Sequence, residues 1–126
     1  MKPSALLTTT ALAHALPSPT AAPVTLARPL NWLAGHALFP GQLLEGFGEP
    51  YENYTMQTWA LHVLGKCREK TECNSTVSFA VLDEGGRAVK WVGYAFWGPH
   101  TTQNDYNRSA RVQESVAYNV VRLPGA

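Results

Sequence analysis

The sequence predicts an α+β protein in which one main helix packs on a small antiparallel sheet, made of a hairpin and flanking strands. Three observations lead to this fold class. Apolar residues recur every three or four positions over 56–67, alternate on both sides of a turn between 77 and 96, and alternate again over 114–122. A chain of 126 residues with one such set of elements has room for a single core, which we place at 24–126 as one domain.

The first fifteen residues are expected to be removed before the protein folds. Lys2 precedes an apolar stretch, and residues 13–15 are Ala-His-Ala, which matches the small-x-small pattern of signal-peptide cleavage. An amphipathic helix is the alternative, but the prolines that follow would end it. We therefore expect a secretory signal peptide at 1–15, a Pro/Ala-rich linker or pro-segment at 16–23, and a secreted, extracellular protein. No later stretch has the roughly 18 apolar residues that cross a bilayer, so no membrane association is expected.

The hydrophobic pattern is weak in the first part of the domain and clear in the helix that is predicted after it. Glycines and prolines interrupt short apolar groups over 24–48, which predicts one strand and a turn-rich connection. A helix is predicted next, with an apolar face formed by Met56, Trp59, Ala60, Val63, Leu64 and Cys67. We expect Asn53 to cap its N-terminus. Charged residues lie at the ends that the helix dipole favours: Glu49, Glu52, Lys66 and Arg68.

A hairpin and a final strand follow the helix. Residues 77–81 alternate between apolar and small side chains, and 83–86 are Asp-Glu-Gly-Gly, a turn sequence. Residues 88–96 alternate again, with apolar or aromatic side chains on both faces, so one face should carry the helix. Residues 97–111 are polar and without periodicity, which predicts a long surface loop. The last alternating stretch, 114–122, should close the sheet.

Three Asn-x-Ser/Thr sequons support export. They begin at Asn53, Asn74 and Asn107, and such sites carry N-linked glycans in secreted proteins. A glycan is bulky and hydrated, so each modified asparagine must lie at the surface. The structural alternative makes Asn53 a helix cap and the other two turn residues. We take all three as candidate glycosylation sites.

The two cysteines, Cys67 and Cys73, are expected to form a disulfide in an exported protein. Closing a loop of about seven residues contributes roughly 2 kcal/mol by the chain-entropy estimate. A redox or metal pair is the alternative, but it would need a two-residue spacer or a second pair of ligands. The spacing of His36, His62 and His100 does not suit a metal site either, so we expect no metal and no cofactor.

These residues together resemble the helix-plus-hairpin core of PAN/apple-like domains, as found in small secreted proteins of filamentous fungi. The similarity covers about residues 50–122. Cys67 and Cys73 match the second and third cysteines of the family pattern, which the family pairs with each other. Val63 stands at the position of the first cysteine and Gly93 near that of the fourth. The resemblance therefore implies that both ends of a second bridge are missing together.

The resemblance implies a non-enzymatic recognition module that binds a carbohydrate or protein ligand outside the cell, as an effector or a wall-binding protein would. Trp97, His100 and Tyr106 are candidate contact residues, since aromatic rings stack on sugars or anchor interfaces. The alternative places Trp97 in the core and lays Tyr106 flat on the sheet. Trp32 and Trp59 are expected in the core.

A small secreted ribonuclease is the alternative function. It would use His62 or His100 as general acid, Glu114 as general base, and Arg108 or Arg111 to hold the phosphate. No spacing ties these residues together, and a net charge of +1 creates no field that gathers nucleic acid. Paired carboxylates that a glycosidase would need fall at a helix start and a turn tip: Glu49 with Glu52 and Asp83 with Glu84. We therefore assign no catalytic residue and expect no nucleic-acid partner.

Overall fold

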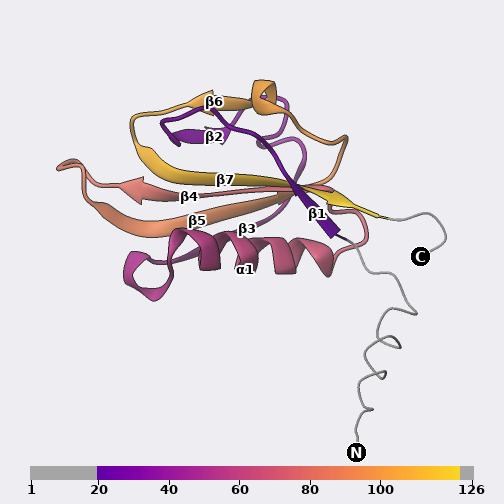
Figure 1. The fold of residues 1–126 in the computed structure, drawn as a ribbon, viewed down its shortest axis with the longest axis horizontal. Helices are drawn as coiled ribbons and strands as arrows, with labels where there is room; N and C mark the ends of the chain where they lie inside the picture. Colours follow the sequence, from indigo (N-terminus) through magenta and orange to yellow (C-terminus); the bar gives the residue numbers. More distant parts are fainter. Residues whose placement is uncertain (1–19, 123–126) are drawn as a thin grey trace, which may run out of the picture.

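The computed structural model describes residues 20–122, and these form the predicted α+β architecture (Figure 1). An antiparallel sheet has the strand order β1-β7-β4-β5-β3. Its strands are β1 (Thr20–Pro23), β3 (Leu43–Pro50), β4 (Ser75–Leu82), β5 (Ala88–Phe96) and β7 (Val112–Val121). The one α-helix in this part of the chain, α1 (Met56–Arg68), covers one face. A smaller sheet of β2 (Trp32–Ala34) and β6 (Tyr106–Arg108) lies over the other face.

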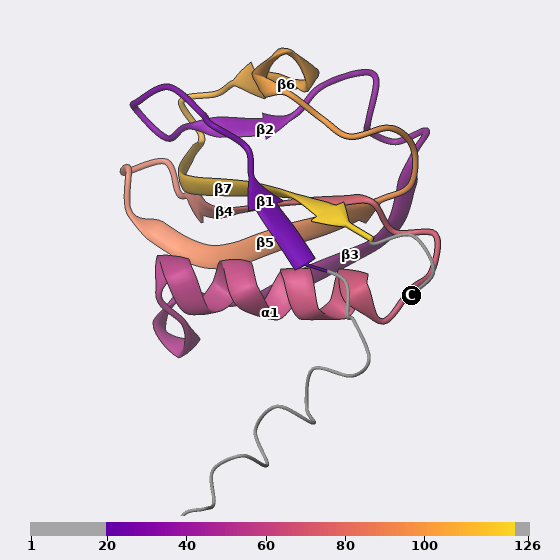
Figure 2. The same ribbon diagram turned by 45° about the vertical axis from the view of Figure 1, so that its right-hand side comes forward.

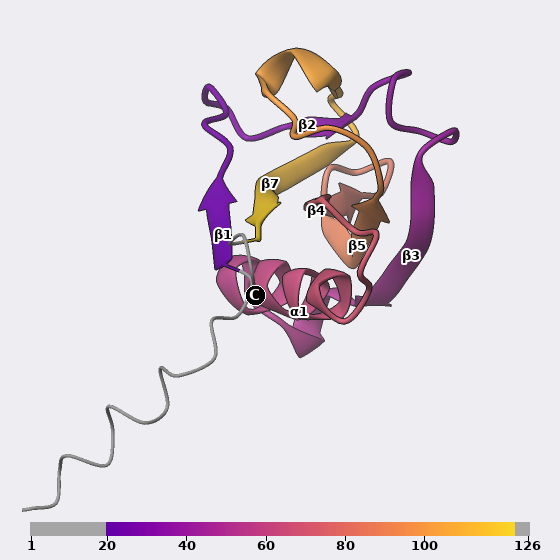
Figure 3. The same ribbon diagram turned by 90° about the vertical axis from the view of Figure 1, so that its right-hand side faces the viewer.

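The large sheet curls around the helix. In the end-on view of Figure 3 the two edge strands, β1 and β3, lie on either side of α1, while the central strands pass above it. The intermediate view of Figure 2 shows the β2–β6 pair on the side of the sheet away from α1. The fold therefore has three layers, and the large sheet contributes side chains to a core on each of its faces.

The helix is confirmed, but its predicted cap is wrong. Thr55 is the N-cap: its Oγ1 accepts from the Thr58 backbone N–H at 3.2 Å, and the Thr58 Oγ1 accepts from the Thr55 N–H at 2.8 Å. Asn53 lies two residues earlier, in the 3-10 turn η2 (Tyr51–Asn53), and its side chain is exposed. A threonine at both ends of the first turn satisfies two backbone donors, which Asn53 is too far away to do.

The buried face of α1 is the predicted one, since Trp59, Ala60, Val63, Leu64 and Cys67 are all buried. Glycine in β5 allows the helix to approach closely. A Cβ added at Gly93 would lie 2.4 Å from Val63 Cγ2, which real side chains do not tolerate. Val63 therefore occupies the space above Gly93.

The predicted disulfide is confirmed. Cys67 and Cys73 are bonded and fully buried, and they tie the end of α1 to the residues just before β4. Arg122 closes the same turn from outside, because its guanidinium donates to the carbonyls of Cys73 at 2.6 Å and Lys70 at 3.0 Å. The end of the helix is thus held by one covalent bond and two hydrogen bonds.

The hairpin is also confirmed, but the prediction for 24–48 is largely wrong: the one strand expected in its first half is reduced to the three residues of β2. Residues predicted as a turn-rich connection contain β3, an eight-residue edge strand paired with β5. Gly46 suggested a break, yet it lies opposite Tyr94, and a Cβ there would be 3.3 Å from the tyrosine Cε1 atom. The glycine makes room for a neighbouring ring instead of ending a strand.

The first strand, β1, was not predicted. β1 consists of the last four residues of the segment 16–23, for which we predicted a linker or pro-segment, and it pairs with β7. Pro23 fits there because β1 is an edge strand.

The final strand is confirmed as β7 but lies between β1 and β4, so it does not form the sheet's edge. The predicted signal peptide at 1–15 lies outside the described residues.

The prediction of one long surface loop over 97–111 is wrong. This stretch contains the 3-10 turn η3 (Gln103–Asp105) and the strand β6, which pairs with β2. A three-residue strand gives too few alternations for periodicity to reveal it.

Candidate binding surface

Trp97 differs from the other tryptophans in its environment. Its side chain is 46 % exposed, whereas Trp32, Trp59 and Trp91 are buried. It directly follows β5, at one end of the large sheet. Tryptophan has a large apolar surface that folding normally covers, so an indole left half exposed is a candidate contact group.

The backbone that carries Trp97 is fixed to the turn before β3. The Trp97 N–H donates to the Gln42 carbonyl at 3.0 Å. The next residue, Gly98, has a φ of +112°, and a Cβ there would lie 2.4 Å from the Gln42 Oε1 atom. Glycine is therefore required, and the glutamine side chain packs directly against this backbone.

Further hydrogen bonds hold the rest of the loop. The Asn74 Nδ2 donates to the Gly98 carbonyl at 2.7 Å, and the His100 Nε2 donates to the Val120 carbonyl at 2.8 Å. The Thr101 N–H then donates to Oδ1 of Asn119 at 2.8 Å. The loop is thus attached to the ends of β4 and β7 as well as to the turn before β3.

A second exposed aromatic residue lies in that turn. Phe39 is 39 % exposed, and its ring centroid is 5.0 Å from that of Tyr94. The turn is internally bonded, since the Phe39 N–H donates to the Gly35 carbonyl at 3.0 Å and the Gln42 N–H to the Leu38 carbonyl at 2.9 Å. We call residues 35–42 and 97–102 together the Trp97 surface, in which Gly35, Leu38 and Thr101 are buried and the other residues are exposed or half-buried. Neither segment contains Asp, Glu, Lys or Arg.

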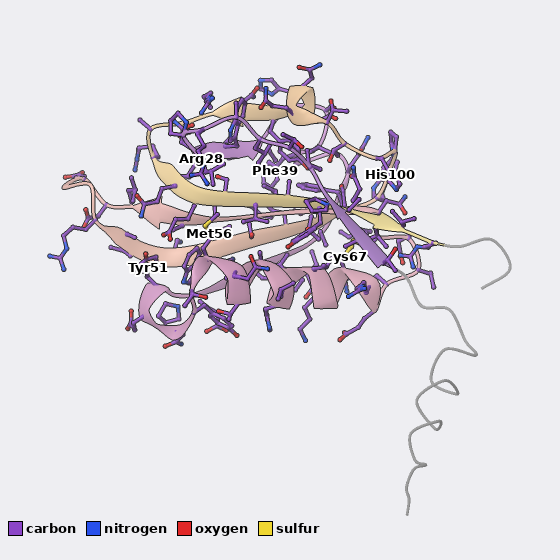
Figure 4. All side chains as sticks on the ribbon, in the orientation of Figure 1. Arg28, Phe39, Tyr51, Met56, Cys67 and His100 are labelled. Carbon is purple, nitrogen blue, oxygen red and sulfur yellow. A yellow bond between two sulfur atoms is a disulfide. The ribbon has the colours of Figure 1, made fainter. Side chains whose placement is uncertain are left out.

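The predicted contact residues are only partly brought together. His100 is exposed and belongs to the Trp97 surface (Figure 4). Tyr106 is 3 % exposed and packs in the core beneath the β2–β6 pair, so it is not available on the surface. Its hydroxyl lies 2.8 Å from Thr101 Oγ1, and burial raises its pKa to about 12. Phe39 and Gln42, which sequence reasoning missed, take its place on the surface.

An aromatic cluster lies near the other end of the helix. The Tyr51 ring stacks on Trp91 at 4.9 Å, and its hydroxyl donates to the Glu114 carboxylate at 2.8 Å, which raises the pKa of the tyrosine. Glu114 has a φ of +59° where the register of β4 and β7 shifts. The Trp91 indole N–H donates to the Tyr51 carbonyl at 2.8 Å. These contacts fasten η2 to the sheet, and no sequence pattern pointed to the pair Tyr51 and Glu114.

The two histidines, Arg108 and Glu114 of the ribonuclease alternative are not gathered in one place. His62 stacks on Trp59 on the helix side of the sheet, with ring centroids 5.3 Å apart. Arg108 lies over the Trp32 ring in the β2–β6 layer, on the opposite side. Glu114 accepts a hydrogen bond from Tyr51, and Figure 4 shows Tyr51 and His100 toward opposite ends of the molecule. Glu114 and His100 therefore do not share a site.

The sequon asparagines also differ from one another. Asn53 and Asn107 are exposed, whereas Asn74 is partly buried beneath the Trp97 loop.

Within residues 20–122 no group of three or more His, Cys, Asp or Glu side chains could hold a metal ion, and the surface of this part contains no pocket. The same part has no helix long and apolar enough to span a membrane.

Comparison with known proteins gave no match to this chain among family models, curated proteins or solved structures.

Proposed function

We propose that this protein is a secreted, non-enzymatic recognition module that binds a carbohydrate or protein ligand through the Trp97 surface. The observation that carries the proposal is Trp97 itself, a half-exposed indole on a backbone bonded to neighbouring elements. A large aromatic side chain on a rigid support loses little conformational entropy on binding, and such residues dominate the energy of many interfaces.

The PAN/apple-like resemblance supports a recognition role. In the family pattern, Val63 stands at the position of one cysteine and Gly93 near that of its partner, so the resemblance implies that the two residues are close together. A Cβ added at Gly93 would lie 3.3 Å from the Val63 Cβ, close to the roughly 3.5–4.5 Å that separates these atoms in disulfides. This proximity is compatible with the resemblance, in which Val63 stands at the first cysteine position and Gly93 near the fourth.

The test is binding by three matched proteins. We would compare the wild type, Trp97→Ala and Leu61→Ala, because Leu61 is 48 % exposed on α1, away from the Trp97 surface. Binding to a glycan array, to cell-wall polysaccharide and to a plant protein extract would be measured, together with turnover of RNA.

We expect the wild type and Leu61→Ala to bind equally, and Trp97→Ala to bind at least about tenfold more weakly, since losing an interface tryptophan commonly costs 2 kcal/mol or more. Equal binding by all three proteins would reject the Trp97 surface. Cleavage of RNA by the wild type would favour the ribonuclease alternative instead.

A further inference from the structure

The three sequons place their asparagine amides in different surroundings. Asn107 is exposed on β6, and its side chain makes no hydrogen bond to the described residues. Asn53 is exposed in η2, and its Nδ2 has one long contact, 3.5 Å from Glu49 Oε1. Asn74 is partly buried, and its Nδ2 donates to the Gly98 carbonyl at 2.7 Å. The Asn107 Nδ2 lies 3.5 Å from the position that a Cβ on Gly35 would take. Asn53 and Asn107 are thus exposed residues whose Nδ2 atoms lack a close hydrogen-bond partner among the described residues, whereas Asn74 is partly buried and closely bonded.

Asn74 is also fixed through its backbone. Its N–H donates to the Phe96 carbonyl at 2.8 Å, and its own carbonyl accepts from the Val120 N–H at 2.8 Å. It follows Cys73, which the disulfide ties to α1. The residue therefore joins the ends of β5 and β7, and its amide reaches from this point to the loop that carries Trp97.

We propose that the secreted protein carries N-linked glycans on Asn53 and Asn107, while Asn74 remains unmodified and serves as an anchor of the Trp97 loop. In the transfer, the asparagine Nδ2 attacks the anomeric carbon of a lipid diphosphate-linked oligosaccharide. The bond from that carbon to the diphosphate oxygen breaks, the lipid diphosphate leaves with the electron pair, and one of the two protons of Nδ2 is transferred to a base of the glycosylating enzyme.

A glycan on Asn74 would destabilise the folded loop. The modified nitrogen would keep one hydrogen, but a sugar ring bonded to it needs space and water beside an atom that lies 2.7 Å from the Gly98 carbonyl. The ring would have to push the loop away from β4. Because transfer takes place before folding is complete, the selection acts through folding. Chains modified at Asn74 fold less stably and are depleted from the exported protein.

The proposal requires export but not the proposed ligand-binding role. It does bear on that role, since Asn53 lies near the N-terminal end of α1 and Asn107 in the β2–β6 layer. A glycan on Asn53 would lie on an element that does not form the Trp97 surface, and one on Asn107 would start beside Gly35, the first residue of that surface. A glycan on Asn74 would emerge beside Gly98.

The test uses the full chain expressed in a eukaryotic secretory host. Glycopeptide mass spectrometry of the secreted protein would give the occupancy of each sequon, with Asn53→Gln, Asn74→Gln and Asn107→Gln as variants. We expect two glycans, and the first and third variants should each lack one. Asn74→Gln should keep both glycans but unfold at a lower urea concentration, measured after enzymatic removal of the glycans.

A fourth variant separates the sequon from the anchor. Thr76→Val destroys the third residue of the sequon but leaves the Asn74 amide in place, so it should change neither the glycan mass nor the loop. A glycan found on Asn74 of the secreted wild type, loss of a glycan in Thr76→Val, or absence of glycans from Asn53 and Asn107 would each overturn the proposal.

Discussion

The tryptophans differ in exposure enough for fluorescence to distinguish them. Trp32, Trp59 and Trp91 are at most 7 % exposed, whereas Trp97 is 46 % exposed. Acrylamide quenches indoles that it can reach, so it should quench one component of the emission strongly and leave the rest. We expect the substitution Trp97→Phe to remove the quenchable component. Unchanged quenching in this variant would show that another tryptophan is accessible.

Which aromatic residue faces solvent depends on contacts that no short stretch of sequence records. Trp97 and Tyr106 both lie in a polar, aperiodic region, and both were expected as contact residues. Tyr106 is buried because β6 pairs with the distant β2, and Trp97 is exposed on a turn at Gly98, whose positive φ bends the chain after β5. The sequence therefore pointed to the right loop but not to the right set of side chains.

At the scale of elements, the N-cap of α1 gives a direct stability test. Thr55→Ala removes the hydroxyl that accepts from the Thr58 N–H, which should lower the free energy of unfolding by about 1 kcal/mol. Asn53→Ala is the matched control and should change it little, since Asn53 is not the cap. Urea unfolding of the unglycosylated proteins measures both. A larger loss in Asn53→Ala would contradict the assigned cap.

The elements that could be predicted are those with local periodicity. α1 and the β4–β5 hairpin repeat their pattern over eight or more residues, and each was found where expected. β3 was missed because Gly46 accommodates the Tyr94 ring across the sheet. β1 and β2 have four and three residues, and their pairing with distant strands decides their conformation. Tertiary contacts override weak local preference in these segments.

For the whole molecule, the juxtaposition of α1 and β5 can be tested with an added bridge. In the double substitution Val63→Cys with Gly93→Cys, the two sulfurs should bond, because the Cβ positions are 3.3 Å apart. Thiol titration should find no free cysteine. A closed loop of about 30 residues should add roughly 3.7 kcal/mol to the free energy of unfolding by the chain-entropy estimate.

The single variant Gly93→Ala is the control for this design. Its Cβ would clash with Val63 Cγ2 at 2.4 Å without any bond in return, so we expect it to be less stable than the wild type in urea. Two free thiols in the double variant, or a Gly93→Ala variant as stable in urea as the wild type, would show that the helix and β5 are further apart than described.

The most direct measurement of the central claim is hydrogen exchange of the protein with and without its bound ligand. Recognition through the Trp97 surface predicts slower exchange of backbone amides in residues 35–42 and 97–102, with no change along α1 or in the β2–β6 layer. Slower exchange confined to α1 or to β2 and β6, with none in the two segments of the Trp97 surface, would contradict it.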